Sequence, residues 1–205
     1  MDSLSGQSIG TGRRVRSAET RRRLLDSAAQ LIAELGWGGV RTRAVAEHAG
    51  LPHGTVSYHF RGKQELLTEA ALNTIERVFP IEELEAVETL EALTGLVQAW
   101  VGERDSIDPV LSGVLMEAMR EAERNPVLRH RLATMLRDYR RVVADLVRAE
   151  QRRDVVRSGP EPSAVATLIA AAGDGLLLHA LLDPELDVAG ATEALLALLR
   201  KETGR

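Results

Sequence analysis

Cysteine is absent from the 205-residue chain. This absence excludes disulfide bonds and thiolate metal sites, and it is compatible with a reducing cytoplasm, where we expect the protein to act. Ligand-type spacings of histidine and acidic residues, phosphate-binding glycine loops and catalytic serine turns are missing as well. We therefore expect no metal, no cofactor and no enzymatic activity.

Long apolar runs are also scarce. The basic residues near the N-terminus have no apolar run behind them, so we expect no secretory signal. Residues 164–182, AVATLIAAAGDGLLLHALL, are nearly long enough to span a bilayer, but Asp174 lies near their middle. A charge there costs about 3 kcal/mol even on the lenient insertion scale. We expect a helix buried in protein and no membrane association.

Charge is unevenly distributed along the chain. Residues 1–63 contain ten Lys and Arg against five Asp and Glu, whereas the remaining residues contain sixteen against twenty-five. Because acidic surface repels polyanions, contact with a nucleic acid should be confined to roughly the first sixty residues.

Helical periodicity dominates the sequence, and no strand alternation is visible. A first helix is expected between Ser17, a candidate N-cap, and a stop at Gly36. The fold class is therefore all-α, with about nine helices, and we divide the chain into a flexible basic arm (1–16), a three-helix head (17–62) and a helical body (63–205). Further helices are expected over 43–49 (capped by Thr42), 53–59, 63–79, 88–103, 109–124, 126–152, 164–182 and 188–201.

The stretch AGLPHGTVSYHFRGKQELL, residues 49–67, contains a tight glycine turn between two short helices. Such a pair forms a helix-turn-helix, whose second helix lies in the major groove of DNA while the first braces the backbone. The apolar residues of this region are spaced to face the first long helix and form a small core. They are Val45, Ala46, Ala49, Leu51, Val56 and Phe60.

The second of these helices, HGTVSYH, begins with small residues that permit close approach to DNA. Gly54 lets the backbone come near the duplex, and Thr55 can donate to a base edge or a phosphate. Tyr58 and Lys63 are placed to clamp one phosphate, and Thr42 at a helix N-terminus can hold another. The expected DNA contacts are Arg41, Thr42, Arg43, His53, Gly54, Thr55, Ser57, Tyr58, His59 and Lys63.

Two assignments in this region stay open. His59 also fits a packed, hydrogen-bonded structural histidine. Arg13, Arg14 and Arg16 either reach a minor groove as an arm or remain in a solvated tail.

Residues 41–67, RTRAVAEHAGLPHGTVSYHFRGKQELL, resemble the tetracycline-repressor (TetR) family of bacterial transcription regulators. Ser57, Pro52 and Val56 depart from the family pattern, in which tyrosine, serine and leucine are frequent. The resemblance implies a repressor that binds an inverted-repeat operator as a homodimer and is released by a small hydrophobic effector. The alternatives are a DNA-binding architectural or adaptor protein without an effector, and a helical enzyme. Matching positions are Gly36, Thr42, Val45, Ala46, Ala49, Gly50, Gly54, Thr55, Tyr58, His59, Phe60, Lys63, Leu66 and Leu67.

The C-terminal part resembles the family by layout. Residues 170–187, AAAGDGLLLHALLDPELD, resemble the first of the two helices through which family members dimerise. A helix that is apolar all round needs partners on both sides, and a second subunit can supply one. Glycines within a helix each cost about 1 kcal/mol against alanine, which is reasonable where a partner helix packs closely. The expected interface residues are Ala172, Gly173, Gly175, Leu176, Leu195 and Leu198.

The resemblance also implies an effector cavity among the middle helices. The chain has six aromatic residues, and three of them belong to the head. The other three are too few for an aromatic cage around a cation, so we expect an aliphatic, acyl or weakly aromatic effector. Asp174 and His179 are read as polar groups of an interface or pocket wall rather than as a catalytic pair. The expected lining is Phe79, Trp100, Met116, Met119, Met135, Tyr139, Asp174 and His179.

Overall fold

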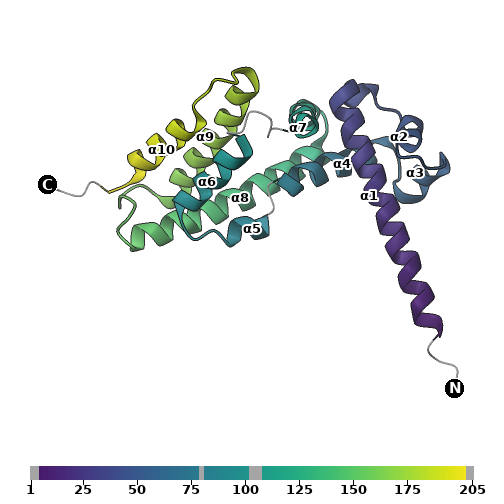
Figure 1. Cartoon of the computed structure of the whole chain (residues 1–205), viewed down its shortest axis with the longest axis horizontal. Helices are drawn as coiled ribbons and strands as arrows, with labels where there is room; N and C mark the ends of the chain where they lie inside the picture. The colour runs from purple at the N-terminus through teal and green to yellow at the C-terminus, as the bar shows by residue number, and fades with distance from the viewer. Residues whose placement is uncertain (1–4, 79–80, 102–107, 202–205) are drawn as a thin grey trace. The chain divides into compact units, whose positions relative to one another are not determined.

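The computed structural model describes residues 5–78, 81–101 and 108–201, with the side chains of residues 5–13, 78 and 100 left out (Figure 1). Within these ranges the regular secondary structure is helical, with one isolated bridge between Val156 and Arg200, so the all-α class is confirmed. The helices are α1 (Ser5–Gly39), α2 (Thr42–His48), α3 (Gly54–His59), α4 (Lys63–Val78), α5 (Ile81–Glu85), α6 (Leu90–Val101), α7 (Pro109–Ala122), α8 (Pro126–Arg152), α9 (Pro162–Leu182) and α10 (Val188–Leu199).

The chain forms two compact units. The head unit comprises residues 1–77 and 109–128, and the body unit comprises residues 78–108 and 129–205. This division differs from the boundary at residue 63 expected from the sequence, because α4 continues the head and α7 packs against α1. The division into an arm, a DNA-binding part and an effector part stays a prediction about function.

Helix α1 is longer than the sequence predicted. It begins at Ser5, so Ser17 lies inside the helix and does not cap it. Position 20, where a capping box would need Glu or Gln, is a threonine whose hydroxyl donates to the Arg16 carbonyl at 2.9 Å. The expected stop at Gly36 is confirmed as a break in helical geometry, because Gly36 has φ 69 and ψ 163.

The head core forms as the apolar spacing predicted. Leu24, Ala28 and Ile32 of α1 are fully buried, and Val45 and Ala46 of α2 are buried with them. Figure 1 shows α2 and α3 beside α1. Ala49, Val56 and Phe60 are buried as well, whereas Leu51 is half-buried.

Helix α7 packs very closely against α1 at Gly113. A Cβ atom at Gly113 of α7 would lie 2.8 Å from Cβ of Ala33 and 2.9 Å from its Cα. Real Cβ atoms do not approach one another so closely, so glycine permits the helices to cross at this point.

The body unit has its own core, in which α5, α6, α8 and α9 meet. The buried carboxylate of Glu150 in α8 accepts the backbone N–H of Leu90 at 3.2 Å, at the start of α6. Gln98 of α6 donates to the Thr192 hydroxyl of α10 at 2.5 Å. Among the described helices, α9 is long and apolar enough to cross a membrane by length and composition. The core residues are Leu84, Leu90, Leu93, Val143, Ala144, Leu146, Val147, Val156, Val165, Ala166 and Ile169.

Candidate nucleic-acid interface

The turn between α2 and α3 fixes the second helix against the first. Gly50 has φ 64, in the left-handed region that glycine adopts without strain, and its N–H donates to the Glu47 carbonyl at 3.0 Å. Arg23 of α1 donates from Nη2 to the Ala49 carbonyl at 2.5 Å, at the end of α2. The start of the turn that leads into α3 is therefore held by α1.

Helix α3 buries its apolar side and exposes its polar side. Val56 is buried, whereas Tyr58 is 73% exposed, which is unusual for a large aromatic side chain. The Tyr58 and His59 rings meet edge to face, with centroids 5.0 Å apart. The predicted contacts Arg41, Arg43, His53, Gly54, Ser57 and Tyr58 are exposed, and Thr42, Thr55, His59 and Lys63 are half-buried.

Two expectations about helix ends are corrected. Arg41 rather than Thr42 precedes α2 as its N-cap residue, so Thr42 is the first residue of the helix. His53 is the N-cap of α3, which begins one residue later, at Gly54. Both changes leave Thr42 and Gly54 at helix N-termini, where backbone N–H groups favour anions.

Glu47 is a component of this surface that the sequence analysis missed. Its Oε1 lies 3.2 Å from Nε of Arg43 and 3.5 Å from Nε2 of His53. One carboxylate therefore lies next to two predicted DNA contacts. The four-residue spacing of Arg43 and Glu47 on a helix could have indicated the first pair, whereas the second depends on how α3 is placed against α2.

Lys63 has a structural partner within the head unit. Its Nζ donates to the Gly38 carbonyl at 3.0 Å, just after the break in α1. An ammonium group has three protons, so this bond is compatible with a phosphate contact. The phosphate role of Lys63 stays a prediction.

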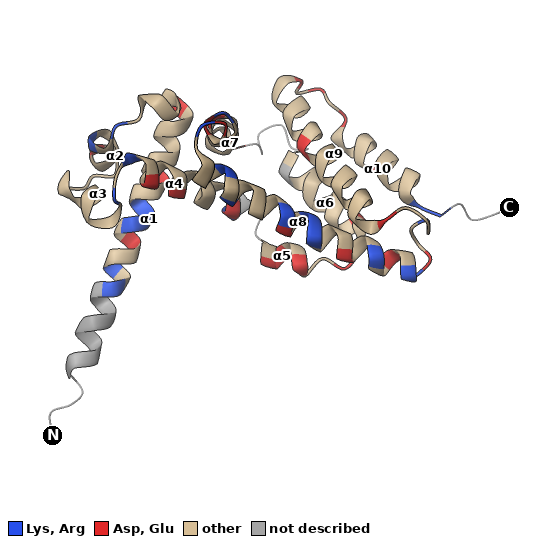
Figure 2. Cartoon of the chain, turned by 180° about the vertical axis from the view of Figure 1, so that it is seen from behind, with Lys and Arg blue, Asp and Glu red and all other residues tan. Residues whose placement is uncertain are grey.

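The arginine run at 21–23 stabilises the head. Arg21 lies 3.3 Å from Glu69 and stacks over the Phe60 ring at 5.1 Å, and Arg22 lies 2.8 Å from Glu19. Figure 2 shows Lys and Arg on the described part of α1 and at α2, whereas Glu residues mark α5 in the body unit. Lys and Arg also lie along α8 of the body unit, so the uneven charge is a property of the summed sequence.

Comparison with known proteins follows the two parts of the chain. The sequence profile of the bacterial regulatory proteins of the tetR family matches residues 24–70. The profile of the C-terminal domain of BetI-type transcriptional repressors matches residues 89–204, which is more than half of the chain. The chain belongs to the TetR family. It is a DNA-binding transcriptional repressor with a helix-turn-helix head.

Individual relatives of this TetR-family repressor are distant. It is 27% identical over 146 residues to the transcriptional regulator UidR of Escherichia coli strain K12, a match that covers 68% of each chain. A solved transcriptional regulator from Saccharomonospora viridis, in complex with choline, has a TM-score of 0.72 at 26% identity and covers 87% of this chain and 94% of that one. SmeT of Stenotrophomonas maltophilia, in complex with triclosan, shares the fold with a TM-score of 0.74 at 24% identity, over 90% and 93% of the two chains.

The predicted effector-pocket residues of the TetR-family repressor fall into two groups. Met116 and Met119 are exposed residues of α7, in the head unit. Met135 and Tyr139 of α8 are half-buried in the body unit, which also contains Asp174 and His179 of α9, both at the surface. That these residues line one effector cavity stays a prediction. Phe79 and the Trp100 side chain lie outside the described residues.

Tyr139 and Asp174 interact electrostatically inside the body unit. Burial raises the pKa of the Tyr139 phenol to about 12, and the negative charge of Asp174 adds to the rise. Nearby protein atoms raise the pKa of the Asp174 carboxyl by desolvation even though the residue is exposed at the surface, and Arg140 partly opposes the rise.

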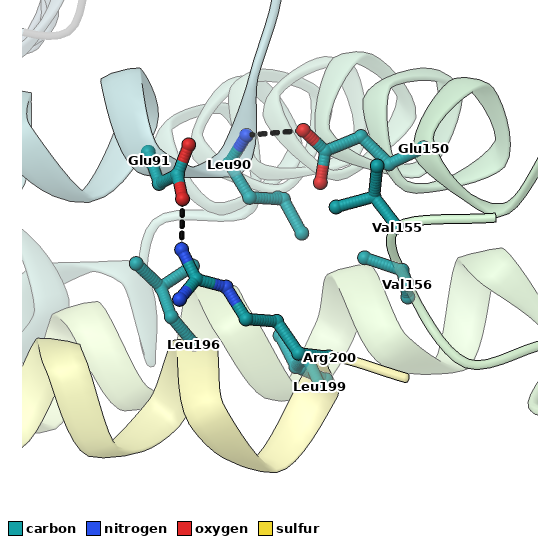
Figure 3. A pocket seen from close by; sticks show the side chains of 8 residues that line it. All are labelled: Leu90, Glu91, Glu150, Val155, Val156, Leu196, Leu199 and Arg200. Atoms are coloured by element: carbon teal, nitrogen blue, oxygen red, sulfur yellow. Dashed lines mark hydrogen bonds and ion pairs between the residues drawn. The ribbon is translucent and has the colours of Figure 1, made fainter. Parts of the chain in front are cut away.

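A shallow depression lies elsewhere in the body unit, between the start of α6 and the C-terminal ends of α8 and α10 (Figure 3). Its volume of about 10 Å³ is close to the minimum for one water molecule. Glu91 and Arg200 form an ion pair at its edge. The depression is too small for an effector, and its wall contains none of the predicted pocket residues. The lining residues are Leu90, Glu91, Glu150, Val155, Val156, Leu196, Leu199 and Arg200.

The predicted dimer residues lie on α9 and α10. A Cβ atom at Gly173 or Gly175 would meet no atom of the described chain within 4 Å. Leu182 is 80% exposed and Leu198 is 70% exposed, so these two helices present apolar surface in the single chain. Ala172, Gly173, Gly175, Leu176 and Leu195 are half-buried.

Proposed function

We propose that this cytoplasmic repressor binds an inverted-repeat operator as a homodimer, places α3 in the major groove, and leaves DNA when a small, weakly aromatic effector binds. The proposal that α3 binds DNA rests on the exposed polar side of this helix. Its apolar side is committed to a buried core, while Tyr58, Ser57 and Gly54 face solvent. A large exposed aromatic beside small residues suits a helix that approaches a duplex closely.

The proposed contacts have two roles. Gly54, Thr55 and Ser57 face the bases, where short side chains allow hydrogen bonds to groove edges. Thr42 and Tyr58 contact phosphates and set the register. The remaining proposed contacts, in the same surface, are Arg41, Arg43, His53, His59 and Lys63.

Exposed apolar surface on α9 and α10 supports the homodimer. Leucines as exposed as Leu182 and Leu198, on two neighbouring helices, indicate a protein–protein contact more than solvent. A two-fold dimer carries two copies of α3, so half-sites should lie about one turn of DNA apart or slightly more, near 34 to 36 Å for a simple pair.

The low aromatic content supports the proposed effector class. Choline in the Saccharomonospora viridis complex is a quaternary cation, which proteins commonly hold by aromatic faces. This chain has only three aromatic residues outside the head part 17–62. An aliphatic or acyl compound suits such a body better.

Release requires only that the effector bind better to a geometry that cannot engage both half-sites. Helix α4, which follows the helix-turn-helix directly in the chain, is the proposed connection. Allosteric coupling of about 1 to 3 kcal/mol would weaken operator binding by roughly five- to 150-fold, and operator DNA would weaken effector binding equally.

The test begins with selection of bound duplexes from random-sequence DNA by the full-length protein. We expect an enriched inverted repeat, and Tyr58→Ala should bind the selected duplex more weakly than wild type does. Because Tyr58 is exposed, this variant should keep its thermal midpoint within about 2 °C of wild type. Binding without any enriched sequence would favour the architectural alternative.

The effector arm of the test uses the selected duplex and three compounds: decanoate, choline and triclosan. Decanoate should weaken operator binding at least about fivefold. Release by choline alone would overturn the aliphatic class. An effector that binds tightly while operator affinity stays constant would overturn the release mechanism.

A further inference from the structure

Glu117 of α7 holds a backbone group of α1 within the head unit. Its Oε2 accepts the N–H of Trp37 at 2.7 Å, and its Oε1 lies 2.7 Å from Nη2 of Arg120. The Glu117 side chain is only 18% exposed. Although Glu117 lies within the region matched by the C-terminal profile, it belongs spatially to the DNA-binding head.

The break at Gly36 creates the need for this acceptor. Gly36 leaves helical geometry, and this rotates the following peptide group away from the helical ladder. A buried N–H without an acceptor destabilises the fold, and a carboxylate is a stronger acceptor than a neutral group. A Cβ atom at position 36 would lie 3.2 Å from Oε2 of Glu117, so glycine also leaves room for the carboxylate.

Trp37 passes this restraint to the start of α4. Its buried indole donates from Nε1 to Oε1 of Gln64 at 3.1 Å. One residue further on, the Gly38 carbonyl accepts from Lys63 at 3.0 Å. The connection after the break is thus held by α7 from one direction and by the first turn of α4 from another.

This connection leads directly into the DNA surface. Val40 is fully buried, and Arg41 is the extended N-cap residue of α2, with φ −122 and ψ 138. Thr42 begins the helix. Because only a few residues separate Trp37 from Arg41, a shift of the Trp37 backbone would displace Arg41 and the N-terminus of α2.

We propose that Glu117 is a positioning residue of the DNA-binding surface, which fixes the connection 36–41 and thereby the placement of Arg41 and Thr42. This inference rests on the proposed function, because it takes these two residues as operator contacts. In this role Glu117 acts through its bond with the Trp37 N–H, and it is not one of the proposed DNA contacts.

The experiment measures affinity of full-length variants for the duplex selected by the wild-type protein. Glu117→Ala removes the acceptor and should weaken binding about tenfold. Glu117→Gln retains an acceptor oxygen and should stay within about threefold of wild type. Glu123→Ala, which removes an exposed carboxylate just beyond α7, should bind like wild type and controls for the change in net charge.

A volume-matched variant and a local probe separate positioning from loss of the fold. Glu117→Met keeps the bulk of the side chain without an acceptor and should weaken binding as Glu117→Ala does. The Trp37 amide resonance in a ¹⁵N-labelled protein should move in both variants and remain in place in Glu123→Ala.

The outcomes distinguish this inference from the function beneath it. If the wild-type protein selects no duplex, the proposed function fails. If it selects one and Glu117→Met binds that duplex like wild type, the positioning role is overturned. Equal losses in Glu117→Gln and Glu117→Ala would also overturn it, because the acceptor would then not matter.

Discussion

Gly113 of α7 lies where α7 crosses α1, and a single methyl group at this position should destabilise the protein. In Gly113→Ala the new Cβ would lie 2.8 Å from Cβ of Ala33, whereas carbon atoms in contact prefer about 3.5 to 4.0 Å. The two nearest atoms are Cα and Cβ of Ala33, which are fixed to the backbone, so neither can rotate away. The helices must separate locally to accept the methyl group.

The magnitude follows from two opposing effects. Overpacking of a well-packed contact costs about 1 to 3 kcal/mol. Alanine is favoured over glycine within a helix by about 1 kcal/mol, which offsets part of that cost. The control is Gly38→Ala in the same head unit, where a Cβ atom would meet no described atom within 4 Å. It gains the same helix preference of about 1 kcal/mol without the clash, so the two variants should differ by the overpacking cost of about 1 to 3 kcal/mol.

The assay is thermal unfolding followed by circular dichroism, with both variants at one protein concentration because dimerisation affects the midpoint. At about 3 °C per kcal/mol for a chain of this size, Gly113→Ala should unfold about 3 to 9 °C below Gly38→Ala. Equal midpoints would refute the close crossing of α1 and α7.

Three further predictions concern DNA, the dimer and pH. Lys63→Ala should weaken binding to all duplexes alike and reduce the salt slope by about 1, because a phosphate contact releases counterions; an unchanged slope would remove Lys63 from the interface. Gly175→Arg places a bulky charge where the single chain leaves space, so it should sediment as a folded monomer at low micromolar concentration, and a persistent dimer would move the interface elsewhere. Asp174→Asn should raise the thermal midpoint at pH 7 and have little effect at pH 3. The raised pKa of Asp174 means that its ionised form costs stability, and that cost is lost as pH falls through the folded-state pKa; a midpoint lowered at pH 7 would contradict the direction of this shift.

The head illustrates what local pattern can predict. Val45, Ala46 and Val56 are spaced for one buried side, and Gly50 supplies the turn, so both the helix-turn-helix and its core are legible in a short window of sequence. The ends of the helices shifted by one residue, as at Thr42 and His53, because neighbouring residues specify helix ends less strongly than helix interiors.

The pocket prediction was based on residue type alone. Met116 and Met119 were chosen as adaptable wall, but α7 packs on α1 and leaves both exposed in the head unit. Helix α5 was missed because a five-residue helix is too short to show a period. Lys63 was assigned to phosphate alone, because its partner Gly38 lies 25 residues away in the chain.

By itself the sequence determined the helical fold class, the separation of charge between the N-terminal part and the rest, and the exposed polar side of α3. These properties depend on neighbours three or four residues apart and on summed charge. Only the tertiary structure decided that α7 joins the head, that Glu117 accepts the Trp37 N–H and that Glu47 lies beside His53. Glu117 and Trp37 are 80 residues apart, and such pairs form when whole helix surfaces pack together. Helical periodicity specifies which surface of a helix is buried, but not which other helix covers it.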